Sequence, residues 1–306
     1  MQLPLGFPPD ASPQLAGIAW GFCRGDRPAT LAMLEHLGTS DDSGLTAALM
    51  TLAALPPTDQ ILPAWLHDTP THPMLQALRG ARLIETAWAI RSRVNAEQVS
   101  DEQFEGFFAR LRDAEQGLIE VCGRYPGFGA PWALRLRTAR GLQLGLSEIE
   151  RRYDRLNEHH PHHFDGQNQL LQSLCPKWFG TWAKVFAFGD RVSGEAPPGT
   201  PSRGFLALVA MECLVDPDSG PPAIGPDALH RAADESVWHP AFGRNPHAGE
   251  LHTAFGILDV LHGFEGRAER HFAQLDAAPN ERLMGYLADH FAHRVRQLAV
   301  HSRRLP

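Results

Sequence analysis

Residues 100–123 read SDEQFEGFFARLRDAEQGLIEVCG, and this stretch indicates most clearly how the chain folds. It begins with the pattern of a capping box, Ser100 to Gln103, in which the Ser and Gln side chains satisfy free backbone amides at a helix start. Apolar residues then recur at helical spacing and form one continuous stripe: Phe104, Phe107, Phe108, Leu111, Ala114, Leu118 and Val121. Gly123 suits a helix end. The stretch therefore predicts one long helix that ends near Cys122.

The composition of the whole chain extends this prediction. Its 306 residues include 38 Leu and 39 Ala, but only 11 Val and 8 Ile. β-branched residues suit the half-buried surface of a sheet, whereas Leu and Ala favour helices. We therefore expect an all-α protein with negligible β-structure. Proline and glycine positions place further helices at 28–37, 45–55, 61–67, 73–94 and 203–214, with a break at Gly38–Ser40.

Two stretches have the form of helix–turn–helix units. Residues 126–161 and 246–279 are each bounded by prolines, which lie 35 and 33 residues apart. The second stretch also carries small residues followed by an aromatic one, at Gly256, Gly263, Ala268 and Phe272. This spacing resembles the tetratricopeptide repeat (TPR), in which such positions allow two helices to pack closely.

The order of features elsewhere is similar to that of an uncharacterised bacterial family of TPR-like helical proteins. The likeness rests on Leu78–Ala81 with Trp88, Pro131–Leu134, Arg151–Tyr153 and Lys177–Gly180. It implies a TPR-like α-solenoid of stacked helical hairpins with a concave binding surface, because a single pair of helices cannot bury its own apolar face. It implies no activity.

The sequence favours one α-helical domain over residues 1–306. The strongest linker is SGEAPPGTPS, residues 193–202, which is rich in proline and glycine. The alternative is therefore a pair of lobes, 1–192 and 203–306, joined by this segment.

Charge and cysteine usage exclude several classes of function. The net charge of −7 argues against nucleic acid as a partner, because phosphate binding needs a basic surface. The four cysteines form no CxxC pair, so neither a zinc ribbon nor a thioredoxin-like site is supported. No Lys or Arg precedes Arg24, and no apolar run reaches the roughly 18 residues of a membrane span. We expect a cytoplasmic bacterial protein without a membrane partner.

Histidines are concentrated in one short segment. Residues 158–165 read EHHPHHFD, and the candidate metal ligands within them are His159, His160, His162, His163 and Asp165. Imidazole is a common ligand of transition metals such as Zn or Fe. Pro161 separates the two His pairs, however, so the alternative is a solvated turn between helices. Further histidines follow in the C-terminal third, including His247, His252, His262 and His271.

A second candidate surface combines aromatic and cationic residues. Trp132 and Arg135 are neighbours at i,i+3 on a predicted first helix of a pair. Lys177 and Trp178 open the densest aromatic run of the chain, and stacking beside a cation can hold a peptide. We expect these four residues to bind a partner.

The sequence lacks the local motifs of Ser hydrolases, P-loop enzymes and dinucleotide-binding enzymes. The leading hypothesis is therefore a non-catalytic TPR-like scaffold, without a cofactor, that binds a protein or peptide on its concave face. The rival is a metal-dependent enzyme that acts on a small molecule or a modified peptide through the His cluster, with a metal that activates water or dioxygen.

Overall fold

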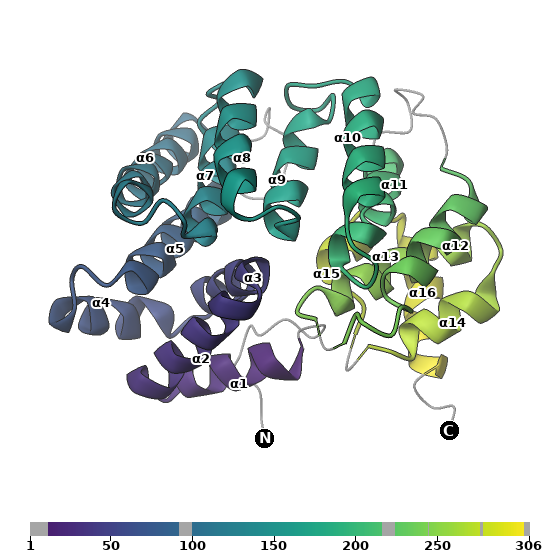
Figure 1. Ribbon diagram of the computed structural model, residues 1–306, viewed down its shortest axis with the longest axis horizontal. Helices are drawn as coiled ribbons and strands as arrows, with labels where there is room; N and C mark the ends of the chain where they lie inside the picture. Colours follow the sequence, from purple (N-terminus) through teal and green to yellow (C-terminus); the bar gives the residue numbers. More distant parts are fainter. Residues whose placement is uncertain (1–11, 92–99, 216–223, 244, 276–277, 303–306) are drawn as a thin grey trace. The chain divides into compact units, whose positions relative to one another are not determined.

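The structure of the protein is a computed structural model, and it describes residues 12–91, 100–215, 224–243, 245–275 and 278–302. Within these ranges the chain is helical and contains no β-strand (Figure 1). The expected all-α class is confirmed. No described helix has both the length and the apolar character that a membrane span requires.

The described chain divides into two compact units, with the boundary between Ser173 and Leu174. The first unit holds residues 14–173, and the second holds residues 12–13 and 174–302 in the described ranges. The division therefore lies about twenty residues before the predicted hinge at 193–202, which belongs entirely to the second unit. Each unit is described by itself below.

The first unit contains nine helices among its described residues. They are α1 (Pro13–Cys23), α2 (Arg27–Ser40), α3 (Asp42–Ala54), α4 (Thr58–Asp68), α5 (Pro73–Arg91), α6 (Asp101–Arg124), α7 (Gly129–Gly141), α8 (Leu146–His159) and α9 (Phe164–Leu174). The expected helices at 28–37, 45–55, 61–67 and 73–94 correspond to α2 to α5, although residues 92–94 lie outside the described ranges. The expected break at Gly38–Ser40 is wrong, because α2 continues to Ser40 and Asp41 then caps α3.

Helix α6 is the predicted long helix, and its start has the predicted chemistry. The Ser100 hydroxyl accepts from the Gln103 amide at 3.2 Å, and the Gln103 side chain accepts from the Ser100 amide at 3.0 Å. The apolar stripe faces α5, where Gly80 leaves room for Leu118. Gly141 at the end of α7 likewise leaves room for Leu111. Small residues thus let α5 and α7 approach α6 closely.

The second unit begins after α9. Its described helices are α10 (Trp182–Glu195), the 3₁₀ helix η2 (Pro201–Gly204), α11 (Leu206–Val215), α12 (Pro226–Glu235), α13 (Ala248–Leu261), α14 (Glu265–Phe272), α15 (Glu281–Met284) and α16 (Asp289–Ser302). The expected helix at 203–214 is divided between η2 and α11. Helix α13 is buried along its length from Leu251 to Val260, so it forms the centre of the unit.

Among the described helices of the second unit, α13 and α14 pack most extensively against each other. A Cβ atom on Gly256 would lie 2.4 Å from the ring of Phe272, so the missing side chain is what lets the ring pack against α13. Gly263 turns the chain between the helices with φ of +81°, a value that favours glycine. Ala268 and Phe272 are fully buried. These are the four positions that carry the likeness to a TPR.

The segment 193–202 is tied to the helices around it. Arg203 donates from Nη1 to the carbonyl oxygens of Ser193 and Gly194, at 2.7 and 2.9 Å, and from Nε to Glu235 at 2.6 Å. The Gly199 amide donates to the Glu235 carbonyl at 2.8 Å. Its proline and glycine therefore shape an ordered turn between α10 and η2.

Candidate functional site

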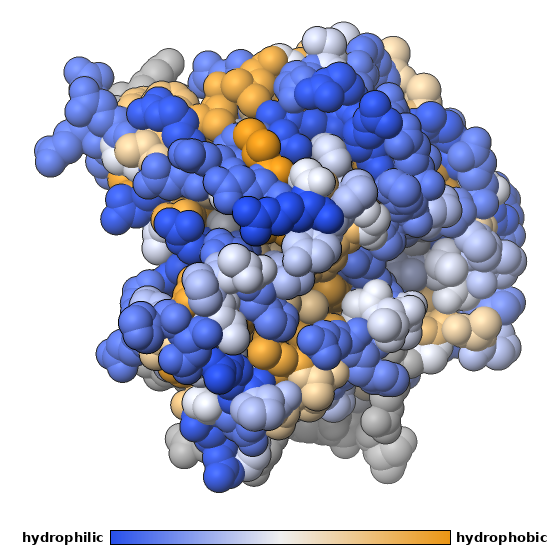
Figure 2. All heavy atoms as spheres, turned by 60° about the vertical axis from the view of Figure 1, so that its left-hand side comes forward, coloured by the Kyte–Doolittle hydropathy of each residue, from blue (hydrophilic) through white to orange (hydrophobic). Residues whose placement is uncertain are grey.

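The first unit carries a groove with a volume of about 350 Å³. Its walls come from α2, the first turn of α3, the start of α5, the turn between α6 and α7, and the residue that follows α8. The lining residues are Glu35, Gly38, Thr39, Asp42, Leu45, His72, Pro73, Met74, Tyr125, Gly127, Phe128 and His160. On the molecular face in Figure 2, hydrophilic residues predominate and apolar residues reach the surface in separate patches.

Two of the sequence-predicted residues support one wall of this groove. The wall is the turn 125–128, which joins α6 to α7. Trp132 donates from Nε1 to the Pro126 carbonyl at 3.1 Å, and His160 donates from Nε2 to the Gly127 carbonyl at 2.7 Å. Tyr125 remains 42% exposed at this turn. Trp132 and His160 therefore hold the turn in place. The sequence predicted a different role for each of them, partner binding for Trp132 and metal binding for His160.

The groove has an acidic character. Glu35 and Asp42 line it, and its described lining residues include neither Lys nor Arg. The Glu35 side chain is 60% exposed and lies 3.9 Å from Nε2 of His72. Apolar atoms of Leu45, Met74 and Phe128 complete the lining. An apolar group that carries a positive charge would complement this surface.

The remaining residues of the His cluster lie on different structural elements. His159 ends α8 on the surface, and His162 has a positive φ of 70° in the turn that follows. His163 is buried before α9, where its Nδ1 accepts from the Gly166 amide and its Nε2 lies 3.2 Å from Asp42.

Asp165 is held by α3. Its amide donates to the Ser43 hydroxyl at 2.9 Å, and its carboxylate lies 3.2 Å from the same hydroxyl. Across the described ranges, no three His, Cys, Asp or Glu side chains are placed so that they could hold one metal ion. Metal binding by this segment stays a hypothesis.

Arg135, the third predicted binding residue, is buried, and its guanidinium is paired with Glu115. Its Nε and Nη2 donate to one oxygen of Glu115 at 3.0 and 2.9 Å. The other oxygen of Glu115 accepts from Arg152 at 3.0 Å and from the Thr138 hydroxyl. Arg152 also donates to Glu148 at 2.7 Å. We call Glu115, Arg135, Thr138 and Arg152 the Glu115 cluster.

Lys177 and Trp178 belong to the second unit, in the turn after α9. The Lys177 ammonium lies 2.6 Å from Glu212, whose carboxylate is buried, so this cation is paired within the unit. Tyr286 donates its hydroxyl to the other oxygen of Glu212 at 3.1 Å, and burial raises its pKa to about 12. Trp178 is half-buried. The four nominated residues are therefore divided between two units.

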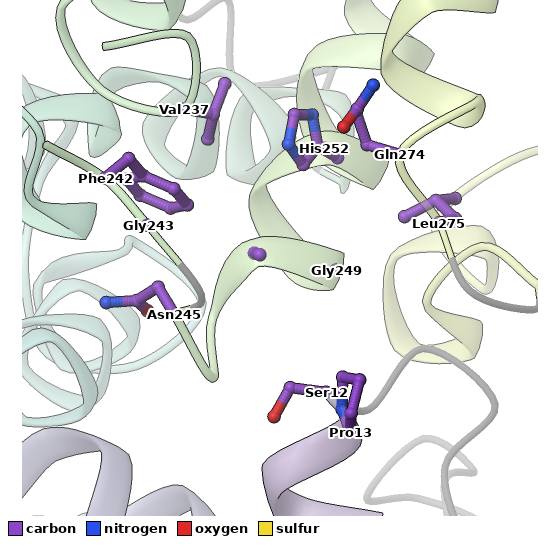
Figure 3. A pocket seen from close by; sticks show the side chains of 11 residues that line it. Ser12, Pro13, Val237, Phe242, Gly243, Asn245, Gly249, His252, Gln274 and Leu275 are labelled. Atoms are coloured by element: carbon purple, nitrogen blue, oxygen red, sulfur yellow. The ribbon is translucent and has the colours of Figure 1, made fainter. Parts of the chain in front are cut away.

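The second unit contains a pocket of about 340 Å³ that sequence reasoning did not predict (Figure 3). Figure 3 shows its lining side chains, among them those of Val237, Phe242, His252 and Gln274. The other lining residues are Ser12, Pro13, Gly243, Asn245, Ala248, Gly249 and Leu275. His252 is only 5% exposed, so its ring forms an inner wall of the pocket.

A chain of hydrogen bonds runs from this wall into the core, and we call it the histidine chain. Nδ1 of His252 lies 2.9 Å from Nδ1 of His271, and Nε2 of His271 accepts from the indole Nε1 of Trp238 at 3.3 Å. Burial lowers the pKa of His252 to about 4 and that of His271 well below its ordinary value. Both rings are therefore neutral at pH 7.

Sequence could not pair these two histidines, because they lie on different helices, 19 residues apart. The available signal was the TPR-like spacing, which predicts that α13 and α14 pack together but not which polar residues meet.

No protein-family model matches the chain, and no curated protein or solved structure shows significant similarity to it.

Proposed function

We propose that the protein is a non-catalytic helical scaffold and that the groove of the first unit binds a peptide segment of a partner protein. The observation that carries this proposal is the groove itself, which combines an apolar lining with Glu35 and Asp42 and has no cation among its described lining residues. The preferred segment has a Lys or Arg next to a large apolar residue, because the two side chains would meet the two kinds of lining.

The proposal includes a TPR-like arrangement of the helical pairs. Two pairs support it, α7 with α8 and α13 with α14, since consecutive helices of each pair pack together at the predicted positions. The contact between Gly256 and Phe272 is the small-to-aromatic packing that such a pair requires.

The edge of the groove is open to solvent, so a side chain of a bound peptide can enter the groove while the rest of the peptide stays outside. Tyr125 and Glu35 are both exposed there, so a bound segment can enter and leave along the surface. Trp132 contributes by holding the turn 125–128 and not by direct contact, which revises the role that the sequence suggested for it.

A pair of synthetic heptapeptides tests the proposal. Both have a Gly/Ser background, and the central dipeptide is Arg-Phe in one and Glu-Phe in the other. We expect the Arg-Phe peptide to bind about five-fold more tightly in fluorescence anisotropy, as one partly exposed charge pair can provide. Amide NMR shifts should change at residues 35–45, 72–74 and 125–128.

Two charge variants localise the binding. Thr39→Arg places a cation in the groove and should weaken the Arg-Phe peptide by about five-fold. Gln116→Arg makes the same charge change at an exposed position of α6 that does not line the groove, and binding should not change. Equal affinity of the two peptides, or equal effects of the two variants, would contradict the proposal.

The rival hypothesis of a metal-dependent enzyme needs ligands beyond those that the described residues bring together. Elemental analysis of protein purified without a His tag tests it directly. Stoichiometric metal that survives a mild chelator would support it.

A further inference from the structure

The histidine chain fixes which atom of His252 carries a proton. An indole N–H can only donate, so Nε2 of His271 must be the acceptor from Trp238. The proton of neutral His271 is then on Nδ1, which donates to Nδ1 of His252. His252 must therefore carry its own proton on Nε2.

Among the described residues, a carboxylate at a longer distance competes for Nε2 of His271. Asp259 lies 3.8 Å from Nε2 of His271, beyond hydrogen-bonding range, while the indole nitrogen lies at 3.3 Å. The opposite order of protons would leave the indole N–H facing another N–H group. The order from Trp238 to His252 is thus the one in which both the indole N–H and the His271 N–H meet an acceptor.

His252 presents a free donor to the pocket. Its Nδ1 is occupied by His271, so the Nε2–H group is the one that faces the pocket. The ring lines the pocket although only 5% of the residue is exposed. Because this N–H group faces the pocket, a ligand with an acceptor atom would form a hydrogen bond to it.

Two further features of the pocket are donors as well. The Asn245 side-chain oxygen accepts from the His247 amide at 2.9 Å, which leaves the NH₂ group of Asn245 for another partner. The 14-residue helix α13 begins beside it, and no side chain caps its first turn. Ala248 and Gly249 of that turn line the pocket, where the partial positive charge of a helix N-terminus favours an anion.

The rest of the lining is uncharged and includes three large apolar side chains. Val237, Phe242 and Leu275 are buried side chains of the wall, and the described lining residues include no Asp, Glu, Lys or Arg. A volume of about 340 Å³ is at the lower end of ligand pockets, which span roughly 300–1,000 Å³.

We propose that this pocket binds a small organic acid, whose carboxylate accepts from His252 Nε2–H, the Asn245 amide and the start of α13, while its apolar body contacts Val237, Phe242 and Leu275. The site is separate from the groove of the first unit, so this proposal does not depend on peptide binding by that groove.

Three probes of similar shape test the charge and the hydrogen bonding: benzoate, benzamide and benzylamine. We expect benzoate to bind the full chain with a dissociation constant of about a millimolar, which suits a ligand of so few atoms. Benzamide should bind about ten-fold more weakly, and benzylamine should not bind, because the pocket offers donors and no anion. Titrations followed by ¹⁵N NMR of the His252 ring give both the affinity and the site.

Variants at the rim keep the fold intact while they change the charge. Gln274 is exposed, so Gln274→Glu should weaken benzoate by about five-fold and Gln274→Lys should strengthen it by a similar factor. Asn245→Asp keeps the oxygen that accepts from His247 but replaces the donor group, and should weaken benzoate by about ten-fold. The matched control is Gln297→Glu, an exposed position of α16 outside the pocket, which should change nothing.

The proposal is overturned by any of three results. The first is a wild-type protein that shows no benzoate-induced shift at His252. The second is equal affinity for benzoate and benzamide. The third is a Gln274→Glu variant that binds benzoate as tightly as the Gln297→Glu control.

Discussion

Each unit of the molecule buries a polar cluster, and the two clusters are built on different principles. The Glu115 cluster of the first unit is ionic, and each oxygen of its carboxylate accepts from an arginine. The histidine chain of the second unit is neutral, because burial keeps both rings unprotonated. The first cluster is closed by its own residues, whereas the second ends in a donor that faces a pocket.

This difference in charge decides which of the two clusters can still offer a hydrogen-bonding group to a ligand. A buried charge must be paired where it lies, and the charges of Arg135 and Arg152 are both paired with Glu115. A neutral imidazole costs less to bury and can leave one N–H group free at a cavity wall. The sequence favoured Arg135 beside Trp132 because a cation next to an aromatic ring can bind a peptide. We infer that the uncharged histidine chain is the better candidate for binding a ligand.

The largest expected effect comes from breaking the closed cluster. Glu115→Leu removes the acceptor shared by two buried arginines, and we expect the free energy of unfolding of the first unit to fall by about 3–5 kcal/mol. Hydrogen exchange of the α6–α8 amides in increasing urea measures this. Glu120→Leu, at an exposed position of α6, should change stability by less than about 0.5 kcal/mol. A loss under about 1 kcal/mol for Glu115→Leu would show that the cluster is not closed.

The stability of the second unit at acid pH tests whether the histidine chain is neutral. An unfolded His gains its proton near pH 6.5, whereas the pKa of His252 is lowered to about 4 by burial. Between these values the unfolded state binds more protons, so the stability present at pH 7 is lost as the pH falls. The slope is about 1.4 kcal/mol per pH unit for each His, or roughly 3 kcal/mol for His252 over the window.

His271 adds to the same slope, since its pKa is lowered by burial and by electrostatic repulsion from Arg267 and Arg270, with further contributions from His252 and His230 when they are protonated. Urea unfolding of the second unit at pH 7, 6 and 5 gives the measurement. His252→Gln should make the slope shallower. Equal stability at pH 7 and pH 5 would mean that the rings are not buried as neutral groups.

Gly256 controls how closely the two histidine-bearing helices approach. Gly256→Ala would place a Cβ atom 2.4 Å from the buried Phe272 ring, and we expect a loss of about 1–3 kcal/mol together with weaker coupling between His252 and His271. Gly194→Ala in α10 meets no atom within 4 Å and should gain up to about 1 kcal/mol from helix propensity. Thermal unfolding of both variants decides, and equal changes would refute the packing argument.

The smallest expected change in stability comes from Trp238→Phe, which tests the order of protons in the histidine chain directly. Trp238→Phe removes the donor that fixes the order of protons, at a cost of about 1 kcal/mol. In ¹⁵N NMR at pH 7.5, wild-type His252 should appear as one tautomer with its proton on Nε2, and the variant should show both tautomers. Trp132→Phe loses a similar indole bond, to Pro126, and should leave His252 unchanged. A mixture of tautomers in the wild type would contradict the assigned order.

Sequence reasoning reached the local structure but not the tertiary partners. The capping box at Ser100 and the positions of Gly256 and Phe272 were predictable because they depend on neighbours within one helix or one pair. The burial of Arg135 was not predictable, since it depends on a carboxylate 20 residues away on another helix. The unit boundary near Leu174 was missed because the nearest proline is Pro176, after α9 has ended.

The anchoring of residues 193–202 by Arg203 has a consequence for limited proteolysis. A protease cuts where the backbone can leave its neighbours and extend into an active site. The carbonyl groups of Ser193 and Gly194 are bound by Arg203, and Gly199 is bound to α12. The segment that most resembles a linker by composition should therefore resist cleavage in the folded protein. A fragment that begins at residue 203 would lack the Ser193 and Gly194 carbonyl groups to which Arg203 donates.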